Sequence, residues 1–277
     1  MMIYTSGFYQ GTDQTLEEAQ TNKLNMLCEK IMLKPGDSYL DIGCGWGTLV
    51  RHAARHFKVN ATGVTLSAEG AGWCRANAEK EGLSSTQCEI LNCDYREIPS
   101  SRRFNAISAV EMAEHVGIAN FGLFLGNVSD MLEDDGLFYM QVAGLRKGSN
   151  WQDTQWGLFM SRWIFPGADA STPLYWYIKQ LELAGFEVHS VENVGRHYSH
   201  TLHAWYDNWV ANRNSSTLKE YPEKLKRLWD IFLAWSVVAS GIGSASCYQI
   251  VSHKNCYTYP RDNFCSKAPV GGLKERK

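Results

Sequence analysis

Glycine recurs at every second position near residue 45, and this spacing is the strongest constraint that the sequence places on the fold. Just before it, Tyr39, Leu40 and Ile42 suit a buried strand, and the residues after Gly47 have the apolar spacing of a helix. Glycine lets the backbone turn sharply and approach a ligand without a side chain in the way. Residues 38–57 therefore predict a strand, a tight turn and a helix, as in nucleotide-binding folds.

The turn also indicates the kind of ligand. Its spacing, Gly43-x-Gly45-x-Gly47, differs from the Gly-x-Gly-x-x-Gly spacing that is typical of pyrophosphate binding, and Asp41 would repel a phosphate. S-Adenosylmethionine carries a sulfonium and an ammonium group and no phosphate, so an acidic side chain attracts it. We therefore expect a methyl-donor site here, in preference to another nucleotide or an ordinary tight turn.

Composition narrows the class of protein. An apolar content of 44% is enough for a full core, and a net charge of -2 without a long basic run argues against a nucleic-acid partner. The eight cysteines form no Cys-x-x-Cys pair, which indicates reduced thiols in an intracellular protein. The longest apolar run, 231–242, is shorter than the ~20 residues of a membrane span, and we expect no signal peptide.

We expect no metal site. The clearest candidate is the set His197, His200 and His203, whose steps of three spread over more than one helix face. No acidic residue completes the set.

Apolar periodicity alternates between helix and strand along most of the chain. The expected helices are 16–33, 47–57, 67–82, 120–133, 173–184, 199–212 and 222–240. The expected strands are 38–42, 59–65, 87–91, 104–110, 137–143, 186–192 and 246–252. This alternation predicts an α/β fold with a doubly wound, mostly parallel sheet.

The same pattern gives the domain organisation. An aromatic-rich stretch at about 144–176 interrupts the alternation, and we interpret it as a helical insertion. We expect one domain over residues 1–257 and a disordered tail over 258–277, which holds proline, glycine and charged residues. Thr15 and Glu18 have the spacing of a capping box at the first helix.

Polar segments follow four of the predicted strands, at 43–47, 65–67, 94–95 and 111–115. Ligands of open α/β sheets bind beyond the carboxyl ends of the strands. We therefore expect these four segments to meet at one site.

Taken in order, these segments resemble the family of cyclopropane-fatty-acid and mycolic-acid synthases. The motifs that carry the resemblance lie at 4–8, 40–47, 63–67, 114–117 and 197–202, and the likeness extends over about residues 3–255. Three further runs, 111–117, 143–147 and 165–173, resemble the fungal sphingolipid 9-methyltransferase branch of that family. The resemblance implies a class I, Rossmann-like fold that uses S-adenosylmethionine.

The resemblance also implies which residues contact the methyl donor. The matching positions are Tyr4 and Thr5 in the N-terminal contact, Asp41, Gly43 and Gly45 in the methionine-binding turn, Thr65 and Leu66 in the ribose segment, and Asp94 and Tyr95 in the adenine segment. Gly70 stands where the family usually has glutamine, which would weaken the contact with the ribose.

Cyclopropane synthases hold a bicarbonate near the reacting carbon, and its ligands match Ser6, Glu114, Gln141 and Tyr198. Ser6 replaces the usual cysteine, Gln141 replaces the usual histidine, and a further family cysteine falls near Ser236. These three substitutions argue against bicarbonate and against ring closure. They favour a branch that adds a methyl group and then regenerates the alkene.

The reaction implied by the resemblance forms a carbocation, which the aromatic insertion could stabilise. A base must then remove a proton. Loss from the methylated carbon leaves a branched alkene, whereas loss from the new methyl group closes a ring. We expect Glu114 to be this base, directly or through an anion or water, with Tyr198 orienting it.

We therefore expect methylation of carbon 9 in the Δ8-unsaturated sphingoid base of a ceramide or glucosylceramide. The expected setting is peripheral contact with the cytosolic face of an internal membrane. One alternative is a cyclopropane-fatty-acyl-phospholipid synthase or another lipid carbon methyltransferase. A second is a non-catalytic remnant truncated at its N-terminus, since relatives carry a helical segment, and in the sphingolipid branch membrane helices, before the Tyr4 motif.

Overall fold

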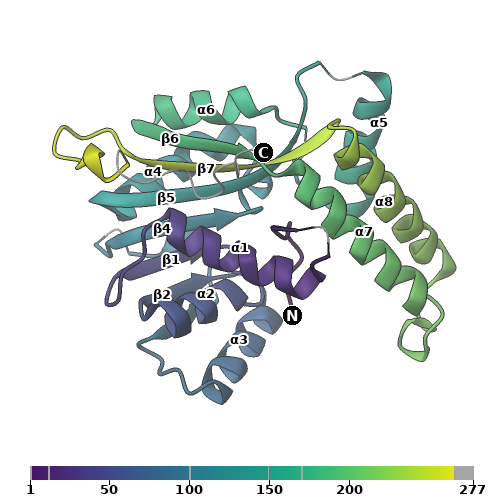
Figure 1. The fold of residues 1–277 in the computed structure, drawn as a ribbon, viewed down its shortest axis with the longest axis horizontal. Helices are drawn as coiled ribbons and strands as arrows, with labels where there is room; N and C mark the ends of the chain where they lie inside the picture. Colours follow the sequence, from purple (N-terminus) through teal and green to yellow (C-terminus); the bar gives the residue numbers. More distant parts are fainter. Residues whose placement is uncertain (1, 12, 100, 149, 170, 265–277) are drawn as a thin grey trace, which may run out of the picture.

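The computed structural model describes residues 2–264, apart from 12, 100, 149 and 170. A seven-stranded sheet in the order β3-β2-β1-β4-β5-β7-β6 forms its centre (Figure 1). The strands are β1 Ser38–Ile42, β2 Asn60–Val64, β3 Cys88–Leu91, β4 Phe104–Val110, β5 Leu132–Leu145, β6 Phe186–Asn193 and β7 Ala245–Lys254. The first five are parallel, and β7 runs antiparallel to both β5 and β6. The predicted mostly parallel sheet is confirmed.

Helices cover both faces of this sheet. They are α1 Leu16–Lys30, α2 Thr48–His52, α3 Ala68–Lys80, α4 Phe121–Met131, α5 Trp151–Phe159, α6 Leu174–Leu183, α7 Gly195–Asn212 and α8 Glu223–Gly241. One core lies between the sheet and α1, α2 and α3, and a second lies between the sheet and α4 and α6 (Figure 1). Tyr39 and Leu40, neighbours in β1, belong to opposite cores because successive strand residues point to opposite faces.

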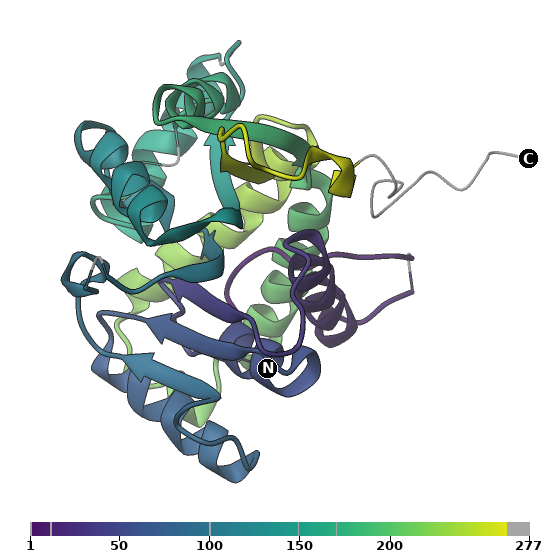
Figure 2. The same ribbon diagram turned by 90° about the vertical axis from the view of Figure 1, so that its left-hand side faces the viewer.

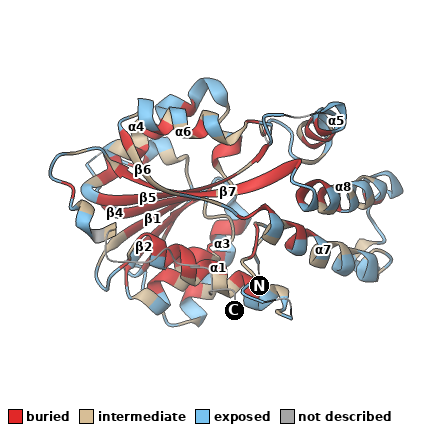
Figure 3. Cartoon of the chain, turned by 45° about the horizontal axis from the view of Figure 1, so that its top comes forward, coloured by how far each residue is buried: buried red, intermediate tan, exposed pale blue. Residues whose placement is uncertain are grey.

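Helices α5, α7 and α8 form a lobe beyond one end of β5 and β7 (Figures 1 and 2). The predicted aromatic insertion supplies α5 and the π-helix Met160–Ile164 of this lobe, which has its own core around Trp156 and Phe232. The outer sides of these helices are exposed (Figure 3). Across the described stretches of the chain, no helix is both long and apolar enough to span a bilayer.

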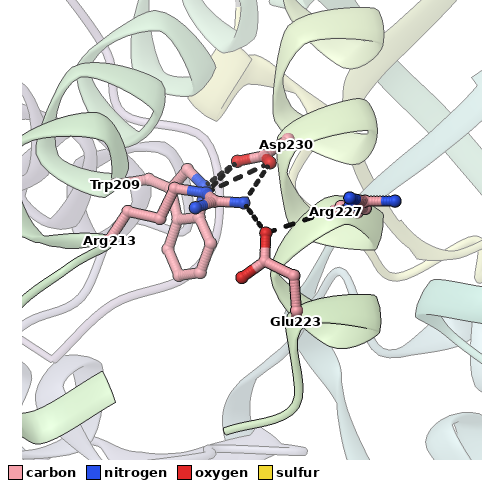
Figure 4. A network of polar contacts seen from close by, with 5 residues as sticks. All are labelled: Trp209, Arg213, Glu223, Arg227 and Asp230. Atoms are coloured by element: carbon pink, nitrogen blue, oxygen red, sulfur yellow. Dashed lines mark hydrogen bonds and ion pairs between the residues drawn. The ribbon is translucent and has the colours of Figure 1, made fainter. Parts of the chain in front are cut away.

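Helices α7 and α8 are joined at their distal ends by a polar network (Figure 4). Trp209 Nε1 donates to Asp230 across 2.7 Å, and Arg213 donates both to Asp230 at 3.0 Å and to Glu223 at 2.7 Å. Arg227 lies 3.9 Å from Glu223. These contacts fix the two helices as an antiparallel hairpin.

Several element boundaries differ from the prediction. Helix α1 keeps the predicted capping box but ends at Lys30, because Met32 has a left-handed backbone (φ 53°) and the Leu33 N–H closes the turn on Cys28. Helix α7 begins at Gly195, four residues earlier than predicted, which places Tyr198 in its first turn.

The end of the chain also differs from the prediction. Residues 258–264 were predicted as part of the disordered tail, yet Arg261–Phe264 form a 3-10 helix and Tyr259 is buried. Tyr259 is ordered because its ring stacks on His253 of β7. The rest of the predicted tail, 265–277, lies outside the described residues.

Candidate active site

A cavity of about 510 Å³ opens at the carboxyl ends of β1, β2, β3 and β4. All nine residues predicted to contact the methyl donor line it: Tyr4, Thr5, Asp41, Gly43, Gly45, Thr65, Leu66, Asp94 and Tyr95. Its volume is in the range of small-molecule sites. The fold therefore brings the four predicted polar segments together at one edge of the sheet, as expected.

The glycine turn shapes the floor of this cavity. Gly43, Gly45 and Gly47 all have positive φ angles, of 78°, 55° and 65°. A Cβ atom at Gly45 would lie 2.8 Å from the hydroxyl oxygen of Tyr4, and one at Gly43 would overlap the side chain of Met112. Only glycine combines this backbone with these close approaches, so the turn needs its glycines for shape as well as for ligand access.

Gly70 lies in the first turn of α3, and the structure explains why this position holds glycine rather than the glutamine that the resemblance implies. A Cβ atom there would lie 2.5 Å from the carbonyl oxygen of Gly45. The Gly70 N–H also donates to Ser67, which caps the helix. Glycine at this position lets α3 pack directly on the turn, and a larger side chain would push the two apart.

Asp41 supplies negative charge at the base of the cavity. Its carboxylate accepts a hydrogen bond of 2.6 Å from Ser108, whose own hydroxyl lies 2.6 Å from that of Tyr39. Burial raises the pKa of Asp41 to about 7, while the hydrogen bond from Ser108 and the charge of Lys23 act in the opposite direction. A buried carboxylate of this kind gains from a cationic ligand, which matches the charge of S-adenosylmethionine.

Lys23 of α1 also lines the cavity. Burial lowers its pKa to about 8, against the opposing charges of Glu111 and Asp41. Its ammonium group donates to the hydroxyl of Thr5 across 2.7 Å. This hydrogen bond holds Thr5 in place at the wall of the cavity.

The rim of the cavity is more open. Tyr4 and Leu66 are 59% and 76% exposed, so a ligand could bury both side chains. At the other side Asp94 is held by Arg96, whose Nε and Nη2 donate to its two oxygens at 2.9 and 2.7 Å. This pairing lowers the pKa of Asp94 and keeps it a charged acceptor.

The side chain of Glu111, just past the end of β4, lies where three predicted residues meet. Its Oε1 accepts from the Ser6 N–H at 3.0 Å and from the Gln141 amide at 2.7 Å. Its Oε2 accepts from the Tyr198 hydroxyl at 2.8 Å. Sequence reasoning did not propose Glu111 as a catalytic residue, although it opens the 111–117 run and directly follows a predicted strand.

Glu114 occupies a different position. Its Oε1 accepts the Ala143 N–H at 2.6 Å, and its buried Oε2 has no hydrogen-bond partner among the described residues. Burial, followed by the charge of Glu111, raises the pKa of Glu114 to about 8. The expected pairing of Tyr198 with Glu114 is not formed, because the Tyr198 hydroxyl points to Glu111 instead.

The remaining candidates serve as packing and support. Ser236 of α8 accepts a hydrogen bond from the Trp156 indole at 3.3 Å, so it ties α8 to the insertion. His197 accepts from the Tyr9 N–H at 3.1 Å and stacks on Phe8. No group of three or more His, Cys, Asp or Glu side chains within the described ranges is arranged to hold a metal ion.

Solved structures with a similar arrangement of helices and strands include two cyclopropane synthases. The chain superimposes on the cyclopropane synthase MmaA2 from Mycobacterium tuberculosis with a TM-score of 0.84 and 23% identity, covering 91% of this chain and 90% of that one. For the mycolic acid cyclopropane synthase CmaA1, in a complex with SAH and CTAB, the TM-score is 0.83 at 23% identity, with the same coverage. The chain therefore has the α/β fold of S-adenosylmethionine-dependent methyltransferases.

Sequence comparison narrows this class to one family. The model for mycolic acid cyclopropane synthetase matches residues 1–250, and this chain belongs to that family. Sphingolipid C9-methyltransferase 1 of Gibberella zeae is 50% identical over 92% of this chain and 50% of its own length. The Candida albicans sphingolipid C9-methyltransferase is 46% identical over 95% of this chain and 52% of its own. The chain thus spans about half the length of the curated relatives that it matches.

Proposed function

We propose that this chain transfers the methyl group of S-adenosylmethionine to carbon 9 of a Δ8-unsaturated sphingoid base within a ceramide or glucosylceramide. The observation that carries the proposal is the 50% identity to a sphingolipid C9-methyltransferase over 92% of the chain. The product is a 9-methyl branched base that keeps its double bond.

The cavity suits the donor in charge and in shape. Asp41 offers a buried carboxylate for a cation, and the glycine turn allows close approach of the backbone. We propose Tyr4, Thr5, Gly43 and Gly45 as the contacts of the methionine part. Thr65, Leu66, Asp94 and Tyr95 are the proposed contacts of the ribose and adenine. The donor, when bound, supplies an electrophilic methyl carbon.

The aromatic insertion adjoins the proposed acceptor side of this cavity. The Asp169 N–H donates to the backbone carbonyl of Glu114 across 2.9 Å. The ring of Phe165 lies edge-on to His115, which lines the cavity, and also to Phe232 of α8. Each aromatic face next to a desolvated cation is worth up to ~2 kcal/mol. The insertion is therefore the proposed wall for the alkene. The proposed polar side is the carboxylate of Glu111, which lines the cavity and accepts hydrogen bonds from Ser6, Gln141 and Tyr198.

We further propose that the lobe of α5, α7 and α8 contacts a membrane surface, where the lipid substrate resides. Large apolar side chains are exposed on its helices or directly after them: Trp151, Leu158, Trp163, Phe165, Trp229, Ile231, Val238 and Ile242. Arg162 and Lys224 lie 5.3 and 5.4 Å from the ring of Trp163. Tryptophan beside cationic groups is typical of the interface between headgroups and acyl chains.

The test is incubation of the purified chain with labelled S-adenosylmethionine and ceramides or glucosylceramides that contain a Δ8 double bond. We expect a product that gains one CH₂ unit and still reacts as an alkene. A phospholipid product without an alkene would instead identify a cyclopropane synthase. Absence of donor binding in calorimetry would refute the proposal and favour the non-catalytic remnant.

A further inference from the structure

We infer that Glu111 is the base that removes the proton from the methylated carbon, so that a carboxylate of the protein acts where cyclopropane synthases hold a bicarbonate. The inference rests on the proposed function and adds a catalytic residue to it. From the sequence, Glu111 was predicted neither as the base nor as a ligand of bicarbonate.

The first argument is the convergence of hydrogen-bond donors. Ser6, Gln141 and Tyr198 occupy three positions that the resemblance assigns to an anion, and all three donate to Glu111 at 2.7–3.0 Å. The thiol of Cys247 lies 3.8 Å from the same carboxylate. The three donors that would bind a free anion therefore already donate to the carboxylate of Glu111.

The second argument is the backbone of Glu111. Its φ angle is +50°, in the left-handed region that favours glycine. Within the described residues only Met32 and Lys58 share this property among those other than glycine. A glutamate in a conformation suited to glycine is strained, and such strain concentrates at sites where a side chain must be held in one place.

The third argument compares the two acids. Glu111 lines the donor cavity. It directly follows β4, which pairs with β1, the strand that contains Asp41. Glu114 is buried behind it and does not line the cavity. One Glu114 oxygen is taken by the Ala143 N–H, and burial raises its pKa, which favours the protonated form near neutral pH. Glu114 is therefore a positioning residue for the segment 111–117.

The proton transfer balances without another reactant. After methylation at carbon 9, the positive charge lies on carbon 8. The C–H bond at carbon 9 breaks, its electron pair forms the new C8=C9 bond, and the proton passes to a carboxylate oxygen of Glu111. The hydrogen bonds from Gln141 and Tyr198 hold that carboxylate in place, and solvent then takes up the proton.

The test uses two substitutions at Glu111 in the full chain. Glu111→Gln keeps the size of the side chain and removes its basicity. Glu111→Gly relieves the strained backbone and leaves a space bordered by the three donors. We expect both variants to lose at least a hundredfold in turnover at saturating donor, while the Kd for the donor changes by less than threefold.

Added formate or bicarbonate distinguishes the two variants. We expect either anion to restore turnover of Glu111→Gly at least tenfold and to leave Glu111→Gln unchanged. Titration calorimetry without methyl donor should detect formate binding to Glu111→Gly and none to the wild type. Glu114→Gln is the matched control, and formate should not raise its turnover.

The inference fails if Glu111→Gln turns over at the wild-type rate, or if neither anion binds to Glu111→Gly while that variant stays folded. It also fails if the only effect of Glu111→Gln is on donor affinity. The proposed function would fail separately, because the wild type itself would then make no 9-methyl product from any sphingolipid.

Discussion

The hydroxyl of Tyr198 lies 2.8 Å from a carboxylate oxygen of Glu111, although 87 positions separate the two residues in the chain. Tyr198 is in the first turn of α7, and Glu111 directly follows β4. This contact joins the helical lobe to the edge of the sheet at the donor cavity. If Glu111 is the base that we propose, this contact makes the position of α7 part of the catalytic geometry.

Tyr198→Phe should therefore slow catalysis without weakening donor binding. A hydrogen bond to a charged group contributes about 1.5–3 kcal/mol, which corresponds to roughly a 10- to 150-fold loss of turnover. The kcat and the donor Kd are measured side by side. Tyr221→Phe, at an exposed tyrosine, is the control and should retain wild-type kcat. A Tyr198→Phe enzyme with unchanged kcat would contradict the role of this contact.

Asp41→Asn should lower donor affinity by at least about tenfold, because the buried charge that attracts the cation is lost. In the wild type, donor affinity should fall as the pH drops below about 7, since Asp41 then becomes protonated. The variant should lack this pH dependence. Calorimetry between pH 6 and 8.5 tests both expectations. An equal pH dependence of donor affinity in the two proteins would contradict the proposal that the Asp41 carboxylate attracts the donor.

The same substitution should stabilise the fold above neutral pH. The pKa of Asp41 is raised from 3.8 to about 7 on folding, so ionising it costs the folded state free energy as the pH rises through this window. At about 1.4 kcal/mol per pKa unit, Asp41→Asn should be more stable by roughly 4 kcal/mol at pH 8. The gain should disappear near pH 4. Urea unfolding at the two pH values measures it.

Gly45→Ala should abolish donor binding and leave most of the fold intact. The added methyl group would stand 2.8 Å from the hydroxyl oxygen of Tyr4, and alanine at a φ of 55° costs about 1–2 kcal/mol. Gly72→Ala is the control in α3, where a Cβ meets open space. That change should raise stability by about 0.5–1 kcal/mol with normal donor affinity.

Trp163→Glu should weaken attachment to anionic lipid vesicles. The substitution removes an interfacial ring and places a negative charge beside Arg162 and Lys224. Co-sedimentation with vesicles is the measurement. Leu183→Glu, at a residue 71% exposed on the far end of α6, is the control and should bind like the wild type. Equal binding of all three proteins to the vesicles would show that the lobe is not the membrane-contact surface.

Much of the donor cavity was predictable from the sequence, because its residues lie in short segments at the ends of strands. In a parallel sheet those ends meet at one edge, so local patterns at Asp41, Thr65 and Asp94 were enough to predict one site. The capping box at Thr15 was also predictable, because its two partners are only three residues apart in the sequence.

The role of each acid was decided only by the tertiary structure. Glu111 and Glu114 are neighbours on a short motif and look alike in the sequence. Glu111 meets donors from positions 6, 141 and 198, whereas Glu114 is buried against the backbone at Ala143. The sequence by itself determined the sheet, the glycine turn and the acidic base of the cavity, because these depend on local spacing. Only packing between distant segments placed Glu111, and not Glu114, at the wall of the cavity, because hydrogen bonds between residues so far apart have no periodic signature in the chain.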